Sequence, residues 1–339
     1  MSAGNVVDIE RLLAEEHAKG KPPSGKRPVL RPLAAHSAFD VYHSEFKEPE
    51  PLIDRLLFPG LTIFVARPKV GKSWFALQIA MAIAKNSALA GSLRVRKPGK
   101  VLYLALEESQ ARTAPRLRKL TGPSDFLEDI SFVYAVDPLM AGGAAQIDSF
   151  LSANPCVLVV IDTYFALAKQ AGRKDVDIIQ SDYNSVNTLR EIAQKHNCAI
   201  LLIHHARKAD GDGVDVVLGT SGVSAACDAV WSLKRSPQGD CVLTVRGREM
   251  EELTYALHFE NESPFGWRIT ATGEEATLTA ERRDIVELLR NEGPHVPKMI
   301  ATALKKNPNT IRRLLQKLTE SGLVSKNGET YSLVPEVSA

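Results

Sequence analysis

The residues best suited to chemistry lie between residues 66 and 73, where the sequence reads ARPKVGKS. This stretch follows an apolar run at residues 61–65 and leads into residues 74–80, whose apolar side chains recur at helical spacing. A strand, a short loop and a helix with Gly-Lys-Ser at the junction is typical of a cradle for the phosphates of a nucleoside triphosphate. Backbone N–H groups and the positive end of the helix dipole face the anion in such a loop. The sequence therefore predicts nucleotide binding at this loop.

Two side chains of the loop have predicted roles. We expect Lys72 to reach the β- and γ-phosphate oxygens and Ser73 to ligate Mg²⁺, so that the predicted cofactors are ATP and Mg²⁺. The usual pattern begins with Gly, and here Ala66 takes that position. Alanine is small but tolerates a positive φ less well than glycine. The residues expected to contact the nucleotide are consecutive: Ala66, Arg67, Pro68, Lys69, Val70, Gly71, Lys72, Ser73 and Trp74.

Acidic residues end two other apolar runs. Asp162 closes the run at residues 157–161, which is typical of a Walker B carboxylate that holds Mg²⁺ through water. Residue 163 is Thr, so no catalytic Glu follows directly. Glu107, at the end of the run at residues 101–106, is our candidate to orient the attacking water, and Glu108 is the competing choice.

A histidine pair ends a further apolar run, at residues 199–203. A neutral His at that place could donate a hydrogen bond to the γ-phosphate and report its loss. Because side chains alternate between the two faces of a strand, only one of the pair can point at the nucleotide. We choose His205 as this sensor, with His204 as the alternative.

Two arginines flank Gly247 in the sequence VRGRE and share one face of a predicted edge strand. They could form a surface ion pair with Glu249 or Glu251. The other interpretation is an arginine finger, supplied to the γ-phosphate of a neighbouring subunit. We favour Arg248 over Arg246 for that role.

The elements that must position these residues alternate apolar strands with helical stretches over residues 46–272. This alternation predicts an α/β fold with a mostly parallel sheet, in which ligands sit at the carboxyl ends of the strands. Four later segments alternate in polarity and are predicted to be antiparallel strands at the sheet edge, residues 229–233, 241–245, 253–259 and 266–269.

The character of the chain changes at residues 277–335. Helical patterns at residues 281–291, 296–306 and 308–321 precede two short strands joined by Asn327-Gly328, which favours a tight turn. Three helices followed by a hairpin predict a winged helix-turn-helix domain.

The predicted recognition helix of this domain carries Arg312, Arg313 and Lys317. Ten basic and six acidic residues between residues 277 and 334 give the domain a net charge of +4, which suits contacts with DNA phosphates. The alternative to DNA binding is that this domain docks another protein, because a winged-helix fold does not by itself determine the function.

Bulk composition limits the function classes. The chain has 339 residues, 44% hydrophobic residues and a net charge of +2, so it can form more than one core and is not a polycation. Residues 1–45 read as a flexible basic tail, for which a solvated linker is favoured over a nucleic-acid arm. The four cysteines match no metal spacing. With no signal peptide and no run of 18 apolar residues, we expect a cytoplasmic protein.

Six motifs occur in a fixed order: ARPKVGKS, YLALEES, VLVVIDT, LLIHHARK, LGTSGVSAACDAVWSL and VRGRE. This order resembles the RecA/DnaB-like ATPases, most closely the RepA-type hexameric replicative helicases of plasmids and phages, over about residues 48–260. The resemblance implies a RecA-like P-loop core. By position it implies phosphate and Mg²⁺ binding by Lys72 and Ser73, Glu107 as base, Asp162 as Walker B, His205 as sensor and Arg248 as trans finger.

The family forms six-subunit rings that use ATP hydrolysis to move along single-stranded DNA in a central channel. The resemblance implies that residues 208–222 face this channel, with Arg207 and Lys208 as DNA contacts, and that the carboxyl-terminal domain is a winged-helix DNA-binding module.

We therefore expect a Mg²⁺-dependent ATPase that acts on DNA as a ring, a RepA-type helicase. The expected partners are DNA, further copies in a hexamer and replication proteins, with no membrane. The alternative is an ATP-switched DNA-binding regulator or helicase loader. Asp210, Asp212 and Asp215 and the lack of an aromatic residue in the channel loop favour this alternative.

Overall fold

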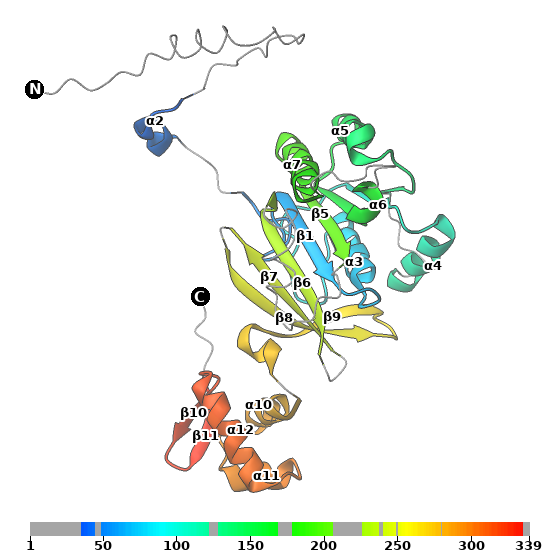
Figure 1. The fold of residues 1–339 in the computed structure, drawn as a ribbon. Coiled ribbons are helices and arrows are strands. Elements are labelled where there is room, and N and C mark those ends of the chain that lie inside the picture. Colours follow the sequence, from blue (N-terminus) through cyan, green and yellow to red (C-terminus); the bar gives the residue numbers. More distant parts are fainter. Residues whose placement is uncertain are drawn as a thin grey trace, which may run out of the picture. The chain divides into compact units, whose positions relative to one another are not determined.

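A computed structural model (Figure 1) describes residues 35–44, 49–121, 128–168, 178–205, 226–236, 240–248, 250–278 and 280–334. Residues 1–48 and 49–339 form two separate units. In the first, α2 (Ala38–His43) begins after Ser37, whose hydroxyl accepts a hydrogen bond from the Asp40 N–H. The remainder of the predicted basic tail, residues 1–34 and residue 45, lies outside the described residues.

A nine-stranded sheet, with strand order β3-β2-β4-β5-β1-β6-β7-β8-β9, forms the centre of the second unit. The strands from β3 to β6 in this order are parallel, and the steps from β6 to β9 are antiparallel. The predicted fold class, a mostly parallel sheet with antiparallel strands at one edge, is confirmed. The strands are β1 (Gly60–Ala66), β2 (Val101–Ala105), β3 (Ile130–Val133), β4 (Leu158–Asp162), β5 (Ala199–His205), β6 (Ala229–Arg235), β7 (Cys241–Gly247), β8 (Met250–Glu260) and β9 (Gly266–Thr272).

Two details differ from the sequence prediction. β6 pairs with β1 in parallel, from Thr62↔Ala229 to Ala66↔Leu233, and is antiparallel only to β7. β7 lies between β6 and β8, so the strand that carries Arg246 is an interior strand and not an edge strand. Alternating polarity shows that one face of a strand is covered, but it does not identify the neighbours of that strand.

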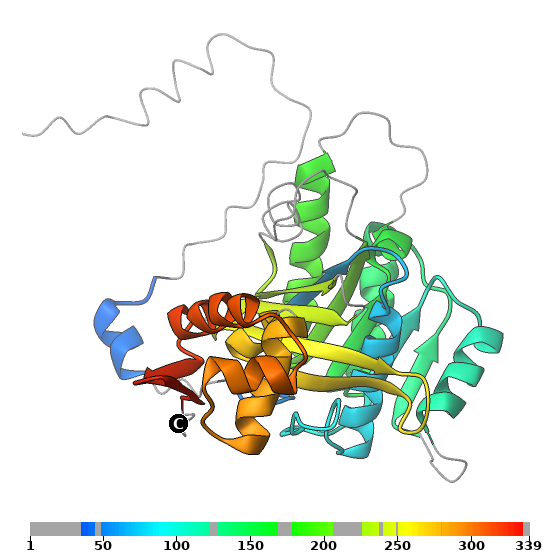
Figure 2. The same cartoon turned by 90° about the horizontal axis from the view of Figure 1, so that it is seen from below.

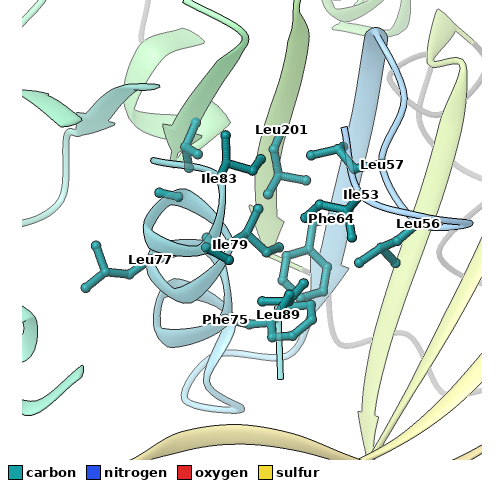
Figure 3. Packing of buried hydrophobic residues seen from close by; sticks show 14 of the residues in the cluster. Ile53, Leu56, Leu57, Phe64, Phe75, Leu77, Ile79, Ile83, Leu89 and Leu201 are labelled. Atoms are coloured by element: carbon teal, nitrogen blue, oxygen red, sulfur yellow. The ribbon is translucent and has the colours of Figure 1, made fainter. Parts of the chain in front are cut away.

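The parallel strands are buried on both faces. Phe64 and Leu201 point towards α3 and pack with its residues Phe75 and Ile79 (Figure 3), while Ile63 belongs to a second core on the opposite face. Continuous apolar runs are typical of strands covered on both sides. α3 and α4 contribute to the first core, and η1, α5, α6 and α7 contribute to the second. These elements are α3 (Lys72–Lys85), α4 (Gln110–Leu120), η1 (Leu139–Ala141), α5 (Gly143–Ala153), α6 (Tyr164–Ala168) and α7 (Ile178–His196).

The antiparallel strands curve back over α3 (Figure 2). Although β9 is the last strand in the sheet order, its residue Trp267 shares the first core with Phe75 and bonds to the Gln78 side chain of α3. The start of α3 is therefore covered by a strand from the far edge of the sheet as well as by the parallel strands.

The carboxyl-terminal domain has its own apolar core. α12 begins at Pro308 after Asn307, whose side chain accepts from the Asn309 N–H at 2.8 Å. Gly328 forms the hairpin turn with a φ of 61°. The predicted helix-turn-helix with a hairpin is confirmed in its element order: α10 (Ala280–Glu292), α11 (Pro297–Ala303), α12 (Pro308–Glu320), β10 (Val324–Asn327) and β11 (Thr330–Leu333). The short helix η2 (Gly273–Thr277) precedes this domain and packs on β8 and β9. Its core residues include Ile285, Leu289, Ile300, Ile311, Leu315 and Leu318.

All four cysteines are buried and none forms a disulfide. Burial raises the pKa of the Cys198 and Cys227 thiols to about 12. Within the described ranges, no helix has the length and apolarity needed to cross a membrane.

Candidate nucleotide site

The predicted phosphate loop joins β1 to α3. Its left-handed backbone positions are Lys69, with a φ of 65°, and Gly71, with a φ of 108°. Ala66 is the last residue of β1, where it pairs with His205 in extended backbone. Alanine at the first position of the motif therefore requires no positive φ, and the loop accommodates it without strain.

Lys72 is buried, with 5% of its surface exposed. Its Nζ donates to the Ala66 carbonyl at 2.9 Å and to the Arg67 carbonyl at 3.1 Å, and lies 3.1 Å from Nδ1 of His205. Burial lowers the pKa of Lys72 from 10.5 to about 8, and the charges of Asp162 and Glu107 oppose this effect. The amine is thus poorly solvated and suited to an anionic partner.

Asp162 ends β4 and is 6% exposed. Its Oδ2 accepts a hydrogen bond from the Tyr103 hydroxyl at 3.1 Å, and its carboxylate also accepts one from the Ser73 side chain. Burial raises the pKa of Asp162, while these two hydrogen bonds act to lower it.

The neighbouring oxygens of Ser73 and Asp162 fit Mg²⁺, a hard cation that prefers oxygen ligands. No group of three or more His, Cys, Asp or Glu side chains forms a metal cage within the described ranges.

The two adjacent glutamates point to different partners. Glu107 accepts a hydrogen bond from Oγ1 of Thr163 at 2.7 Å, and its Oε2 lies 3.5 Å from Nε2 of His205. Glu108 instead forms an ion pair with Arg116 of α4. Glu107 therefore contacts the histidine that lies beside Lys72, whereas Glu108 pairs with α4, although its charge also helps to raise the pKa of Asp162.

The histidine pair divides between the two faces of β5. His205 lies between Lys72 and Glu107, whereas the ring of His204 lies 5.9 Å from the ring of Tyr164 of α6, on the other face. If the protonated amine of Lys72 donates to Nδ1, the neutral His205 ring carries its proton on Nε2, which faces Glu107. A chain of polar contacts then joins Lys72, His205, Glu107 and Thr163 at adjacent strand ends.

Arg248 is not part of this site within one chain. Gly247 pairs with Ala229 at the start of β6, so the end of β7 lies at the amino ends of the parallel strands, opposite the phosphate loop. Arg246 pairs with Glu252, with Nε and Oε2 2.5 Å apart, and Glu249, one of the two partners considered from the sequence, lies outside the described residues. Arg248 is exposed, and its backbone N–H donates to the Asp228 carbonyl at 3.1 Å.

The predicted DNA contacts fall in two places. Arg312, Arg313 and Lys317 are exposed on α12, whose other face packs into the domain core. Arg207, Lys208 and the rest of the predicted channel loop lie outside the described residues.

Sequence reasoning missed three residues that contact the site: Tyr103, Thr163 and Trp267. Tyr103 carried a signal, because a tyrosine within a buried apolar strand usually needs a partner for its hydroxyl. No sequence signal pointed to Trp267. It lies 196 positions after Gly71, to whose carbonyl its indole donates a hydrogen bond.

Comparisons with known proteins agree with a nucleotide site. Residues 27–211, more than half of the chain, match the family model described as AAA domain. Residues 279–326 match the model described as bacterial regulatory protein, arsR family. No curated protein matches the sequence.

Two solved structures are similar to the chain. One is the ATPase domain of another protein, which is 16% identical, with a TM-score of 0.47, over 62% of this chain and 84% of that one. The other is a KaiC-like protein from the archaeon Pyrococcus horikoshii OT3. It is also 16% identical, with a TM-score of 0.46, over 67% of this chain and 99% of that one.

Proposed function

The chain belongs to the AAA domain family, and we propose that its RecA-like core is a Mg²⁺-dependent ATPase that acts on DNA as a ring, as a replicative helicase of RepA type. The observation that carries the proposal is the convergence of Lys72, Glu107, Asp162 and His205 at the ends of adjacent strands. A cation, two carboxylates and a histidine beside a phosphate loop form a set suited to phosphoryl transfer to water.

Each side chain has a distinct task in this proposal. Lys72 stabilises the negative charge on the β- and γ-phosphate oxygens, and the phosphates in turn favour its protonated form. Glu107, held by Thr163, accepts a hydrogen bond from the attacking water and orients it. Ser73 and Asp162 would hold Mg²⁺, which neutralises charge on the phosphates.

His205 is suited to report the state of the γ-phosphate. Its two ring nitrogens lie near Lys72 and Glu107, so loss of the γ-phosphate changes the surroundings of both. The residues that follow β5 directly include Arg207 and Lys208, the DNA contacts that the resemblance implies. Release of phosphate would therefore act on DNA through the end of β5.

In this proposal Arg248 is the arginine finger that one subunit of the ring supplies to the next. Because the end of β7 lies opposite the phosphate loop of its own chain, Arg248 can serve as a finger only in the site of another subunit. Arg248→Ala should abolish hydrolysis and leave nucleotide binding nearly unchanged. Arg246→Ala is the matched control, since Arg246 is engaged by Glu252. Loss of both binding and assembly in Arg248→Ala would indicate a structural role instead.

A second function is favoured by one specific observation. Residues 279–326 match a bacterial regulatory family, and α12 exposes Arg312 and Arg313 opposite its buried face. An ATP-switched DNA-binding regulator or helicase loader would use the same ATPase core without separating strands.

The experiment that distinguishes the two functions measures ATP hydrolysis alone, with single-stranded DNA and with duplex DNA, together with unwinding of a forked duplex. Hydrolysis stimulated by single-stranded DNA and accompanied by unwinding supports the helicase. Stimulated hydrolysis without unwinding contradicts the helicase and supports the regulator. Hydrolysis that is indifferent to all DNA contradicts both.

A further inference from the structure

The indole of Trp267 packs against the phosphate loop from β9. Trp267 is 3% exposed, and its Nε1 donates to the Gly71 carbonyl at 3.2 Å. A Cβ atom added to Gly71 would lie 2.6 Å from Cζ2 of the indole, so the ring fills the space that the glycine leaves open. The Phe259 ring, 5.0 Å away and edge-on, supports the indole from β8.

The backbone of Trp267 is held by α3, the helix that follows the phosphate loop. Gln78 of α3 donates from Nε2 to the Trp267 carbonyl and accepts at Oε1 from the Trp267 N–H, both at 2.8 Å. Gln78 follows Gly71 by seven residues, which places both on one face of α3. β9 therefore contacts α3 at its start through the indole and about two turns later through the backbone.

The position of the indole determines the orientation of one peptide group. The Gly71 carbonyl accepts two hydrogen bonds, one from the Phe75 N–H at 3.1 Å and one from Trp267. In a trans peptide the carbonyl of Gly71 and the N–H of Lys72 point in opposite directions. Fixing the carbonyl towards α3 and β9 thus directs the Lys72 N–H towards the space in front of the helix, where a phosphate binds.

We propose that Trp267 is a positioning residue for nucleotide binding, whose indole holds the Gly71–Lys72 peptide in the orientation that presents the Lys72 N–H to a phosphate. The inference rests on the proposed function, because it requires that a nucleoside triphosphate binds at this loop. Pre-orientation of the N–H group removes an ordering step from binding, so the effect falls on affinity and not on the hydrolytic step.

The test compares Trp267→Phe with Trp231→Phe in the full chain without DNA. Trp231 is 0% exposed on β6, and its indole nitrogen has no hydrogen-bond partner among the described residues, so its replacement loses buried surface but no loop contact. Binding of a fluorescent N-methylanthraniloyl ATP, steady-state hydrolysis and urea unfolding are measured for both. Trp267→Phe should raise the Kd and the KM about fivefold, the effect of one neutral hydrogen bond, with kcat unchanged. Trp231→Phe should leave the Kd and the KM unchanged.

A wild-type Kd in Trp267→Phe would overturn the inference. An equal rise in Kd for Trp231→Phe would also overturn it, because loss of core packing would then explain the effect. A wild-type chain that binds no nucleotide would overturn the proposed function, and the inference with it.

Gln78→Met provides a second test, since it keeps the indole but removes both bonds that hold the Trp267 backbone. It should also raise the Kd. Because both changes act on one tether, the double variant should show less than the product of the two single effects. If the effects of the two changes on the Kd multiply, Gln78 and Trp267 act independently, and the inference that Gln78 acts through Trp267 is overturned.

Discussion

Replacing Lys72 by Met should stabilise the nucleotide-free protein against unfolding. Lys72 is 5% exposed, and burial lowers its pKa from 10.5 to about 8. At about pH 7 the amine is protonated in both the folded and the unfolded chain, so folding buries a charge. Met has a similar length and carries no charge, so the variant avoids this cost.

The magnitude follows from the pKa. A shift from 10.5 to about 8 corresponds to a cost of about 3 kcal/mol at neutral pH. Loss of the two hydrogen bonds to the Ala66 and Arg67 carbonyls, at about 1 kcal/mol each, offsets about 2 kcal/mol. The variant should therefore gain about 1 kcal/mol in unfolding free energy near pH 7.

The pH dependence gives the sign of the effect. Above pH 8 the folded Lys72 loses its proton while the unfolded side chain keeps it up to about 10.5, so wild-type stability rises with pH. The stability of Lys72→Met relative to wild type should fall by about 2 kcal/mol between about pH 7 and pH 9.5.

Urea unfolding of wild type and Lys72→Met without nucleotide, at both pH values, measures the difference. Lys298→Met removes an exposed lysine of α11 and should change stability by less than about 0.5 kcal/mol. A Lys72→Met variant no more stable than wild type near pH 7, or one whose advantage is independent of pH, would show that burial of the Lys72 charge does not destabilise the fold.

Three further changes test individual contacts of the site and of α12. Asp162→Asn should stabilise the nucleotide-free chain in urea, increasingly as pH rises through the raised pKa of Asp162, and should abolish Mg²⁺-dependent phosphate release. A stability below wild type at high pH would contradict this. Glu108→Gln breaks the ion pair with Arg116, so it should lower the free energy of unfolding by less than about 1 kcal/mol and leave kcat within about twofold of wild type. A loss of ATP turnover in this variant would assign the water-orienting role to Glu108. Arg312→Ala and Arg313→Ala should each weaken duplex DNA binding and reduce the slope of log K against log salt concentration by about one. A slope equal to that of wild type in a DNA-binding titration would place the phosphate contacts elsewhere.

Much of the site could be predicted because its parts are local. Glu107, Asp162 and His205 each follow an apolar run, and the carboxyl ends of parallel strands gather at one edge of a sheet. The order of the strands was not needed for this prediction. In the structure the Leu106 N–H donates to the Asp162 carbonyl at 2.8 Å, which holds the ends of β2 and β4 side by side.

The remaining contacts depend on packing between distant segments. The periodicity around Trp267 predicts a strand but not that the strand curves back onto α3, where Gln78 holds it. The same limit explains the position of Arg246, on an interior strand where an edge strand was expected. Non-local pairing is set by twist, connection and shape, which no short window of sequence contains.

ATP turnover by Glu107→Gln, measured beside nucleotide binding, tests whether Glu107 orients the water that attacks the γ-phosphate. Gln keeps the shape of the side chain and its contact with Thr163, but it is a far weaker base for the attacking water. Hydrolysis by wild type should fall at least about a hundredfold in the variant, while the Kd for N-methylanthraniloyl ATP stays within about threefold. Turnover at the wild-type rate in Glu107→Gln, or a loss of nucleotide binding together with turnover, would contradict a water-orienting role for Glu107.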